Sequence, residues 1–205
     1  MHVARRSPDE TRQCILVAAW DLFRQVGFRK TTVADIAGAL GMSSANIYRF
    51  FPSKDALTAA ICRNQLDLLV GTARKAAAGP GSASERIQAV LMSLYRGLRD
   101  QMTNHKRVHE VVAVALEEEW PAIDEFLEAC KTTIARLVEQ GQASGEFGPG
   151  DPAMLGEMTM AASAAIHHPT LIAHCSGDLE AEALVAFALR ALANKNPPMA
   201  SPSSE

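Results

Sequence analysis

The chain has 205 residues, of which 48% are hydrophobic and 21% charged, with a formal net charge of −3. This is enough material for a packed core of one large domain or two small ones. No apolar run approaches the roughly 20 residues of a membrane-spanning helix, and the basic residues 1–6 lead into polar residues rather than a signal sequence. We therefore expect a globular cytoplasmic protein without a membrane partner.

A first helix is predicted to begin at residues 7–10, Ser-Pro-Asp-Glu, which combine an N-cap serine, a proline at the first helical position and a glutamate three residues after the cap. Apolar residues recur at helical spacing from Ile15 to Val26, and Gly27 supplies the stop.

Two shorter helices are predicted next. Thr31 and Thr32 offer caps for a helix that ends at Gly41, and Ser43 offers one for a helix of about two turns that reaches Phe50 and Phe51 before Pro52. Ser53 then caps a fourth helix. Three short helices with a tight glycine-containing turn between the second and third are typical of a helix-turn-helix domain. The motif itself, formed by the second and third helices, spans residues 31–51.

The rest of the chain keeps a helical pattern, so the predicted fold class is all-α. Further helices are expected over residues 54–78, 82–103, 105–119, 120–144, 151–168 and 179–192. We divide the chain into a helix-turn-helix DNA-binding domain (1–52), a larger C-terminal helical domain (53–195) and a polar, proline-rich tail (196–205) that we expect to be disordered.

The charge is divided unevenly along the chain. Residues 1–54 hold eight Lys/Arg against four Asp/Glu, a net +4, whereas the remaining residues hold 12 against 19, a net −7. A basic head on an acidic body is typical of a protein that binds nucleic acid through one end only.

One segment resembles a known family. Residues 31–57 read TTVADIAGALGMSSANIYRFFPSKDAL, and residues 18–29 contain AWDLFRQVGF. This resembles the signature of the TetR (tetracycline-repressor-like) family over about residues 9–57. The resemblance implies a repressor that binds double-stranded DNA, forms a homodimer through its last two long helices, and is released by an unidentified small-molecule effector bound in the C-terminal domain. A two-fold dimer predicts a palindromic operator.

The helix expected to begin at Ser44 has one polar face. A step of about 100° per residue places Ser44, Ala45, Tyr48 and Arg49 together, with Ile47 on the opposite side. Arg49 is our candidate for base reading, with a phosphate contact as the alternative, whereas residues beside helix N-termini would hold phosphates. The predicted DNA-binding residues are Thr31, Thr32, Ser43, Ser44, Ala45, Tyr48, Arg49 and Lys54.

Phe50 departs from the family pattern, which often has histidine at this position. A phenylalanine side chain cannot donate a hydrogen bond to phosphate, and its angular position predicts a packing role.

The body carries two apolar segments, residues 154–166 and 179–192, that have more apolar surface than one helix face requires. We interpret them as the dimer interface; a helix fully buried in a monomer is the alternative. Methionine, aromatic and histidine side chains could line an effector pocket, although each could equally be plain core. The candidate pocket residues are Tyr95, Leu98, Met102, His109, Val112, Trp120, Phe126, Met158 and His167.

We expect no metal and no cofactor. The cysteines stand singly, which predicts reduced and mostly buried thiols, and the histidine pair at 105 and 109 and the cluster at 167–175 lack a recognised metal pattern. We also expect no enzyme, since no nucleophile elbow or glycine-rich phosphate loop is present. The alternatives to a DNA-binding regulator are an enzyme with a helical body and a protein-binding helical adaptor.

Overall fold

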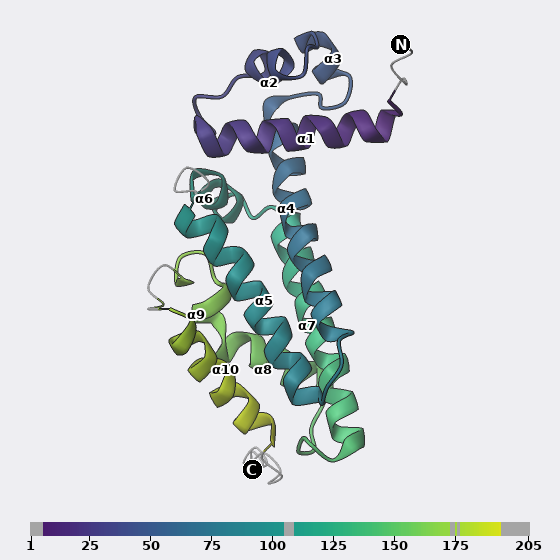
Figure 1. Cartoon of the computed structure of the whole chain (residues 1–205), viewed down its shortest axis with the longest axis vertical. Coiled ribbons are helices and arrows are strands. Elements are labelled where there is room, and N and C mark those ends of the chain that lie inside the picture. The colour runs from purple at the N-terminus through teal and green to yellow at the C-terminus, as the bar shows by residue number, and fades with distance from the viewer. Residues whose placement is uncertain (1–5, 105–108, 173–174, 176, 194–205) are drawn as a thin grey trace, which may run out of the picture. The chain divides into compact units, whose positions relative to one another are not determined.

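The computed structural model describes residues 6–104, 109–172, 175 and 177–193, and these residues form ten helices and no strand (Figure 1). The predicted all-α class is confirmed. Helix α1 (Pro8–Gln25) begins at the predicted capping box, in which the Ser7 hydroxyl accepts from the Glu10 amide and the Glu10 carboxylate accepts from the Ser7 amide. The two reciprocal bonds satisfy amides that a helix start leaves without partners.

Helices α2 (Val33–Ala39) and α3 (Ser44–Tyr48) have Thr32 and Ser43 as their N-cap residues, both of which were among the predicted caps. Helix α3 is shorter than the expected two turns. It ends at Tyr48, and the amides of Phe50 and Phe51 both donate to the Ile47 carbonyl, at 2.9 and 3.0 Å. The chain leaves helical geometry here because a residue that precedes proline, as Phe51 does, is sterically disfavoured in a helix.

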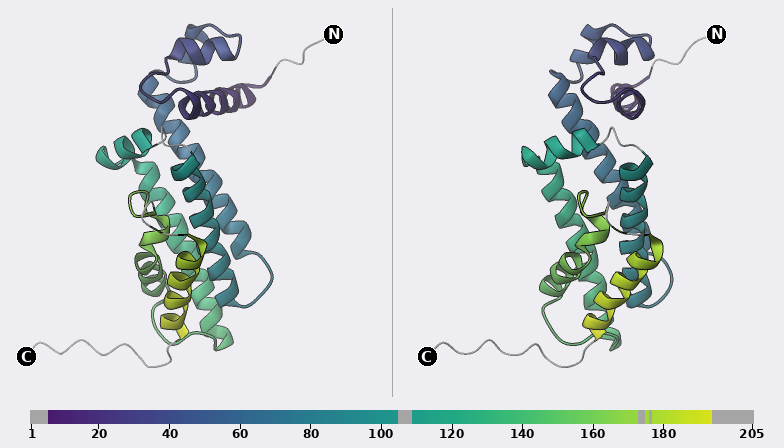
Figure 2. Two further views of the ribbon diagram at one scale, coloured as in Figure 1. Left: turned by 60° about the vertical axis from the view of Figure 1, so that its left-hand side comes forward. Right: turned by 90° about the vertical axis from the view of Figure 1, so that its left-hand side faces the viewer.

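By their contacts the residues fall into two units, Met1–Asp67 with Gln101–Asp124, and Leu68–Asp100 with Glu125–Glu205. The first unit holds the predicted head 1–52, the first half of α4 (Lys54–Ala77) and helix α6 (His109–Glu117). Within it, α1 lies across the α2–α3 pair (Figures 1 and 2). The core that joins these helices is apolar; its most buried members are Ile15, Ala19, Phe23, Ile36, Ile47, Phe51, Leu57 and Ile61.

Helix α6 contributes to the same core. Val111 is 2% exposed within the cluster, and Trp120 packs against it from the turn that follows α6. The helix expected over 105–119 is thus α6, which ends at Glu117, while residues 105–108 lie outside the described part of the chain. Sequence order alone assigns this segment to the body, but its apolar side chains pack with the head.

The second unit contains the end of α4 and most of α5 (Ala83–Asn104) and α7 (Pro121–Ser144). It also contains α8 (Pro152–Ala162), α9 (Ala164–His167) and α10 (Asp178–Ala193). Figure 2 shows α7 beside α4 and α5, with α8 and α10 packed against each other. Helix α8 approaches α7 closely at Gly156, where a Cβ atom would lie 3.0 Å from the backbone nitrogen of Ala135. A larger side chain at Gly156 would force the two helices apart.

The start of α5 is held by a loop distant in sequence. The carboxylate of Glu146 accepts hydrogen bonds from the amides of Ala83 and Ser84, both at 3.1 Å, and from the Ser144 hydroxyl at 3.0 Å. The bonds from the Ser84 and Ala83 amides hold the pKa of the Glu146 carboxyl below its usual value. The loop after α7 is therefore tied to the N-terminus of α5.

The helix predicted from 151 to about 168 is broken at Ser163 into α8 and α9, so that expectation is corrected. The Met160 carbonyl accepts from the Ser163 amide and hydroxyl, both at 3.2 Å, and from Nε2 of His167 at 2.8 Å. Serine hydroxyls that bond to preceding carbonyls compete with helical bonding, and here a buried imidazole completes the alternative arrangement.

His167 predicts a pH dependence of folding. Its side chain is 8% exposed, and burial lowers its pKa below the usual value of 6.5, so the unfolded chain binds the proton more tightly than the folded one. The stabilisation is present above about pH 6.5 and is lost as the pH falls through the lowered folded-state pKa. We expect the unfolding free energy of His167→Gln, measured in urea, to fall less than that of the wild type between pH 7.5 and 5.5.

The neighbouring His168 is exposed and provides the matched control. His168→Gln should keep most of the wild-type pH dependence, because burial, and not the charge of His168, is the main cause of the lowered pKa of His167. If the unfolding free energy of His167→Gln fell with pH as steeply as that of the wild type, the buried imidazole would not govern the pH dependence of stability between pH 7.5 and 5.5.

Several predictions from the sequence fall outside the described residues: the tail 196–205, the side chain of His109, and His105 and His174. No helix in the described ranges is both long and apolar enough to cross a membrane.

All four cysteines are free; Cys62 and Cys130 are buried, whereas Cys14 and Cys175 are partly exposed. Burial raises the pKa of Cys62 to about 11 and that of Cys130 to about 12, which keeps both thiols protonated and unreactive.

Candidate nucleic-acid interface

Helix α3 has one face in the core and one at the surface. Ile47 is 1% exposed and anchors the inner face, whereas Tyr48 is 48% exposed and Ala45 and Arg49 are also exposed. Ser44 is half-buried. The small Ala45 allows a close approach to a DNA groove, and the phenol and guanidinium beside it can reach base edges or phosphates.

The cap residues differ in how free their donors are. The Ser43 hydroxyl accepts from the Asn46 amide at 3.2 Å, which leaves its own proton available to a phosphate. Thr32 instead donates both its amide and its hydroxyl to the Asp35 carboxylate, at 2.8 and 2.7 Å. These bonds lower the pKa of Asp35, so a negative charge already occupies the donors that a phosphate would need at Thr32.

Thr31 lies inside the head. Its side chain is 1% exposed, and its hydroxyl donates to the Gly27 carbonyl at 2.8 Å. The bond closes the turn between α1 and α2 instead of presenting a donor at the surface. Thr31 was predicted as a phosphate contact; this placement assigns it to the packing of the turn.

Lys54 makes an internal contact at the start of α4. Its Nζ donates to the Phe28 carbonyl at 2.9 Å and lies 4.7 Å from the centre of the Phe28 ring, which itself packs edge-on against Phe23. The ammonium thereby ties α4 to the α1–α2 turn through a charge-assisted hydrogen bond and a cation–π contact. An ammonium has three donors, so this bond leaves others for a phosphate.

Phe50 is half-buried and packs against the core of the head, which confirms its predicted packing role. Its carbonyl accepts from Arg12, a contact between residues 38 positions apart that no local pattern indicates. Sequence reasoning also left out Arg29 and Lys30, both exposed in the turn that leads to α2. Lys30 and Arg29 lie two and three residues before the N-cap Thr32, and this position near a helix N-terminus is the signal that makes them candidates for contact with phosphate.

The predicted pocket residues are spread over both units. Tyr95 and Leu98 on α5, Phe126 on α7 and His167 on α9 are buried in the second unit. Met102, Val112 and Trp120 belong to the first unit. Met158 is 59% exposed on α8. The Tyr95 hydroxyl accepts from Arg99 at 2.7 Å, and the same guanidinium nitrogen donates to Asp178 at 2.8 Å, which joins α5 to the start of α10.

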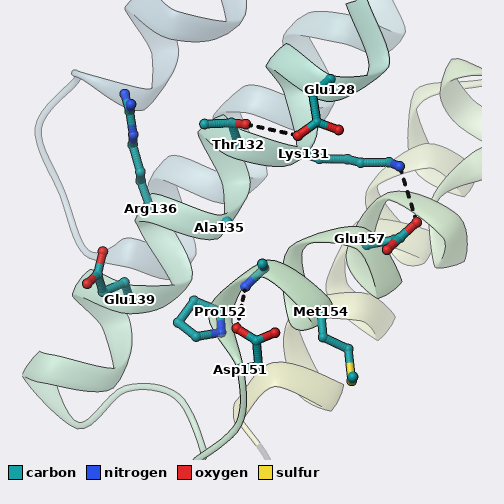
Figure 3. A pocket seen from close by; sticks show the side chains of 11 residues that line it. Glu128, Lys131, Thr132, Ala135, Arg136, Glu139, Asp151, Pro152, Met154 and Glu157 are labelled. Carbon is teal, nitrogen blue, oxygen red and sulfur yellow. Dashed lines mark hydrogen bonds and ion pairs between the residues drawn. The ribbon is translucent and has the colours of Figure 1, made fainter. Parts of the chain in front are cut away.

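A groove of about 660 Å³ lies between α7 and the start of α8 (Figure 3). Its lining is mostly charged, and Figure 3 shows Lys131 reaching across it to Glu157, at 3.1 Å. None of the nine predicted pocket residues lines this groove. The groove thus offers mixed polar and apolar surface, without the aromatic side chains that were predicted to line the effector pocket.

Helices α8 and α10 expose apolar side chains. Met154 and Met158 on α8 are 57% and 59% exposed, and Leu179 and Phe187 on α10 are 84% and 61% exposed. We call these four residues the α8–α10 face. Helices α8 and α10 pack against each other, and large exposed apolar side chains on neighbouring helices are typical of a protein–protein contact.

Two family models match the chain: "Bacterial regulatory proteins, tetR family" over residues 15–61, and "Tetracyclin repressor-like, C-terminal domain" over residues 83–186. The first covers the helix-turn-helix, and the second covers half of the chain and most of the second unit.

Curated relatives agree with these models. The chain is 28% identical over 137 residues to the HTH-type transcriptional repressor KstR2 of Rhodococcus jostii, with 65% of this chain and 66% of the relative covered. It is 41% identical over 63 residues to the HTH-type transcriptional regulator RutR of Escherichia coli K12, with 31% and 30% covered. The matches thus span just under two thirds of one relative and under one third of the other.

A solved structure extends the likeness to nearly the whole chain. A transcriptional regulator of the TetR/AcrR family from Thermobifida fusca is 26% identical, with a TM-score of 0.59 and with 92% of this chain and 99% of that chain covered. Since a family model covers half of the chain and a second one covers helix α3 and the helices that pack against it, the chain belongs to the TetR family of DNA-binding transcriptional regulators, which are not enzymes.

Proposed function

We propose that the protein is a dimeric repressor that binds a palindromic operator and is released from it by a small-molecule effector. The observation that carries the proposal is the placement of α3, whose inner face is locked in the core by Ile47 while Tyr48 and Arg49 stand exposed. A rigidly supported helix with an exposed polar face is what base reading in the major groove requires.

In this proposal Arg49 reads a base, with its guanidinium fork paired to the two major-groove acceptors of a guanine. Tyr48 and Ser44 contact the groove edge, and Ala45 allows close approach. Phosphates are held by Ser43, Lys54, Arg29 and Lys30. Thr32 could contact a phosphate only if its hydrogen bonds to the Asp35 carboxylate were broken. Such contacts position the protein on DNA without specifying sequence.

The dimer forms through the α8–α10 face in this proposal. A helix rises about 1.5 Å per residue, so α8 and α10 are about 16 and 24 Å long, and two copies of the pair could form a four-helix contact with a two-fold axis. That symmetry would place two recognition helices about 34–36 Å apart, one turn of DNA.

The effector binds in the body in this proposal. We keep the buried side chains Tyr95, Leu98, Phe126 and His167 as candidate contacts, and we assign Met158 to the dimer face because it is exposed there. An effector that prefers the conformation released from DNA must weaken DNA binding by the same factor by which DNA weakens effector binding.

This reciprocity is the test of ligand release. A diverse set of small molecules would be screened for compounds that raise the melting temperature of the protein, and each stabilising compound would then be titrated against the protein–operator complex. We expect at least one compound to raise the Kd for operator DNA, and operator DNA to raise the Kd for that compound by the same factor. If every stabilising compound leaves the Kd for DNA unchanged, the proposed release is wrong.

A further inference from the structure

The C-terminal end of α3 is held by a residue of α1. Helix α3 has only five residues, far fewer than an isolated helix needs to be stable, so its position depends on its contacts. Nη1 of Arg12 donates to the Phe50 carbonyl at 3.0 Å, directly after the C-cap residue Arg49. This carbonyl lies where a helix end leaves acceptors without intrahelical partners.

The same guanidinium also holds the next residue. The Arg12 guanidinium carbon lies 4.2 Å from the centre of the Phe51 ring, and Phe51 is 2% exposed in the core of the head. Arg12 thus joins a fixed aromatic ring to a backbone carbonyl one residue away. A flat guanidinium can stack on a ring and donate at its edge simultaneously, whereas the compact ammonium of a lysine cannot reproduce both contacts.

We propose that Arg12 is a positioning residue for sequence recognition: by fixing the backbone at residues 50 and 51, it sets the direction in which Arg49 leaves the end of α3. The inference rests on the proposed base reading by α3. Because Arg49 is the C-cap residue, a shift of the following carbonyl moves the origin of its side chain, and bidentate pairing with a base tolerates little displacement.

The competing role for an exposed arginine in a basic head is a direct contact with phosphate. The two roles differ in their response to lysine. A phosphate contact is kept by Arg12→Lys and lost in Arg12→Met, with a decrease of about two in the slope of log Kd against log salt concentration, one for each subunit of the proposed dimer. A positioning role is lost in both variants, and it changes base preference rather than the salt dependence.

The experiment uses the full-length protein and a DNA site selected by the wild type. For the wild type, Arg12→Lys, Arg12→Met and Arg49→Ala, one would measure the ratio of Kd values for the selected site and for sites altered at single base pairs, the salt dependence of Kd, and the thermal melting curve. Arg29→Met serves as the control for loss of charge, because Arg29 is an exposed basic side chain to which we assign no role in holding α3.

We expect Arg12→Lys and Arg12→Met to reduce discrimination at the base pair read by Arg49 by about fivefold or more, with the salt dependence of Arg12→Lys unchanged and all variants folded at the temperature of measurement. Arg29→Met should keep the full discrimination and weaken all sites alike. In the double variant Arg12→Met/Arg49→Ala, discrimination should be no lower than in Arg49→Ala alone. Both substitutions act on the same contact, the one between Arg49 and the base.

Wild-type discrimination in Arg12→Lys, together with a reduced salt dependence in Arg12→Met, would assign Arg12 to phosphate and overturn the inference alone. If Arg12→Met were unfolded, Arg12→Lys by itself would decide, since it keeps the charge and most of the length of the side chain. A wild-type protein without base preference would instead overturn the proposed function and this inference with it.

Discussion

Phe187→Glu is expected to convert the protein from a dimer to a monomer and to weaken operator binding about 100-fold or more. Phe187 is 61% exposed at the α8–α10 face, and a carboxylate there would have to lose its water in the contact between subunits. A monomer must bind each half-site independently, without the high effective concentration that the second head has in a dimer. Sedimentation velocity measures the oligomeric state, and titration of fluorescent operator DNA measures the affinity.

Leu68→Glu provides the matched control, because Leu68 is 60% exposed on α4, outside this face. It adds the same charge at a side chain with the same exposure and should leave both the dimer and the DNA affinity unchanged. A dimeric Phe187→Glu protein with wild-type affinity would contradict the assignment of the interface, and a monomeric wild type would contradict the proposed dimer.

Arg49→Ala is the second change with a large expected effect. Loss of a bidentate contact to a base costs about 1–3 kcal/mol of discrimination, and the dimer makes the contact twice. We expect the affinity for the selected site to fall about 30-fold or more, while binding to unrelated DNA falls much less, since Arg49 would then contribute only its charge. Competition titrations against specific and random DNA measure the two effects separately.

Tyr48→Phe is the companion to Arg49→Ala. It keeps the ring of this 48% exposed residue and removes only the hydroxyl, so the loss in affinity should be smaller than that from Arg49→Ala. If Arg49→Ala weakened specific and random DNA by the same factor, Arg49 would be a phosphate contact and the base would be read by another residue.

The helix starts could be predicted from sequence because they depend on contacts over three residues. The spacing of residue types predicts the local hydrogen bonds between Ser7 and Glu10 and between Ser43 and the Asn46 amide. The inward position of Ile47 follows equally from helical periodicity. The helix boundaries of the head could therefore be predicted from its sequence to within a few residues.

The remaining features depend on residues far apart in the chain. The contacts of Arg12 with Phe50 and of Lys54 with Phe28 join positions 38 and 26 residues apart, and they use cations that read simply as exposed charge in the sequence. Thr31 is similar, since either of two adjacent threonines could be the cap, and only packing buries this one. The break between α8 and α9 depends on a bond from His167 to a carbonyl seven residues earlier, which no propensity encodes.

The effector pocket is the part of the body that sequence reasoning described least well. Its nine candidate residues are apolar, aromatic or histidine side chains at helical spacing, and such side chains serve a packed core as readily as a ligand site. The structure separates them by unit and by burial, and it places Met158 at the surface.

Selection of binding sites from a pool of random duplex DNA at low salt is the decisive measurement for operator recognition by helix α3. We expect the wild-type protein to enrich an inverted repeat whose half-site centres lie one helical turn apart, about 34–36 Å, and Arg49→Ala to lose preference at the same base pair in both half-sites. Enrichment of no sequence, or of a single site without two-fold symmetry, would contradict this expectation.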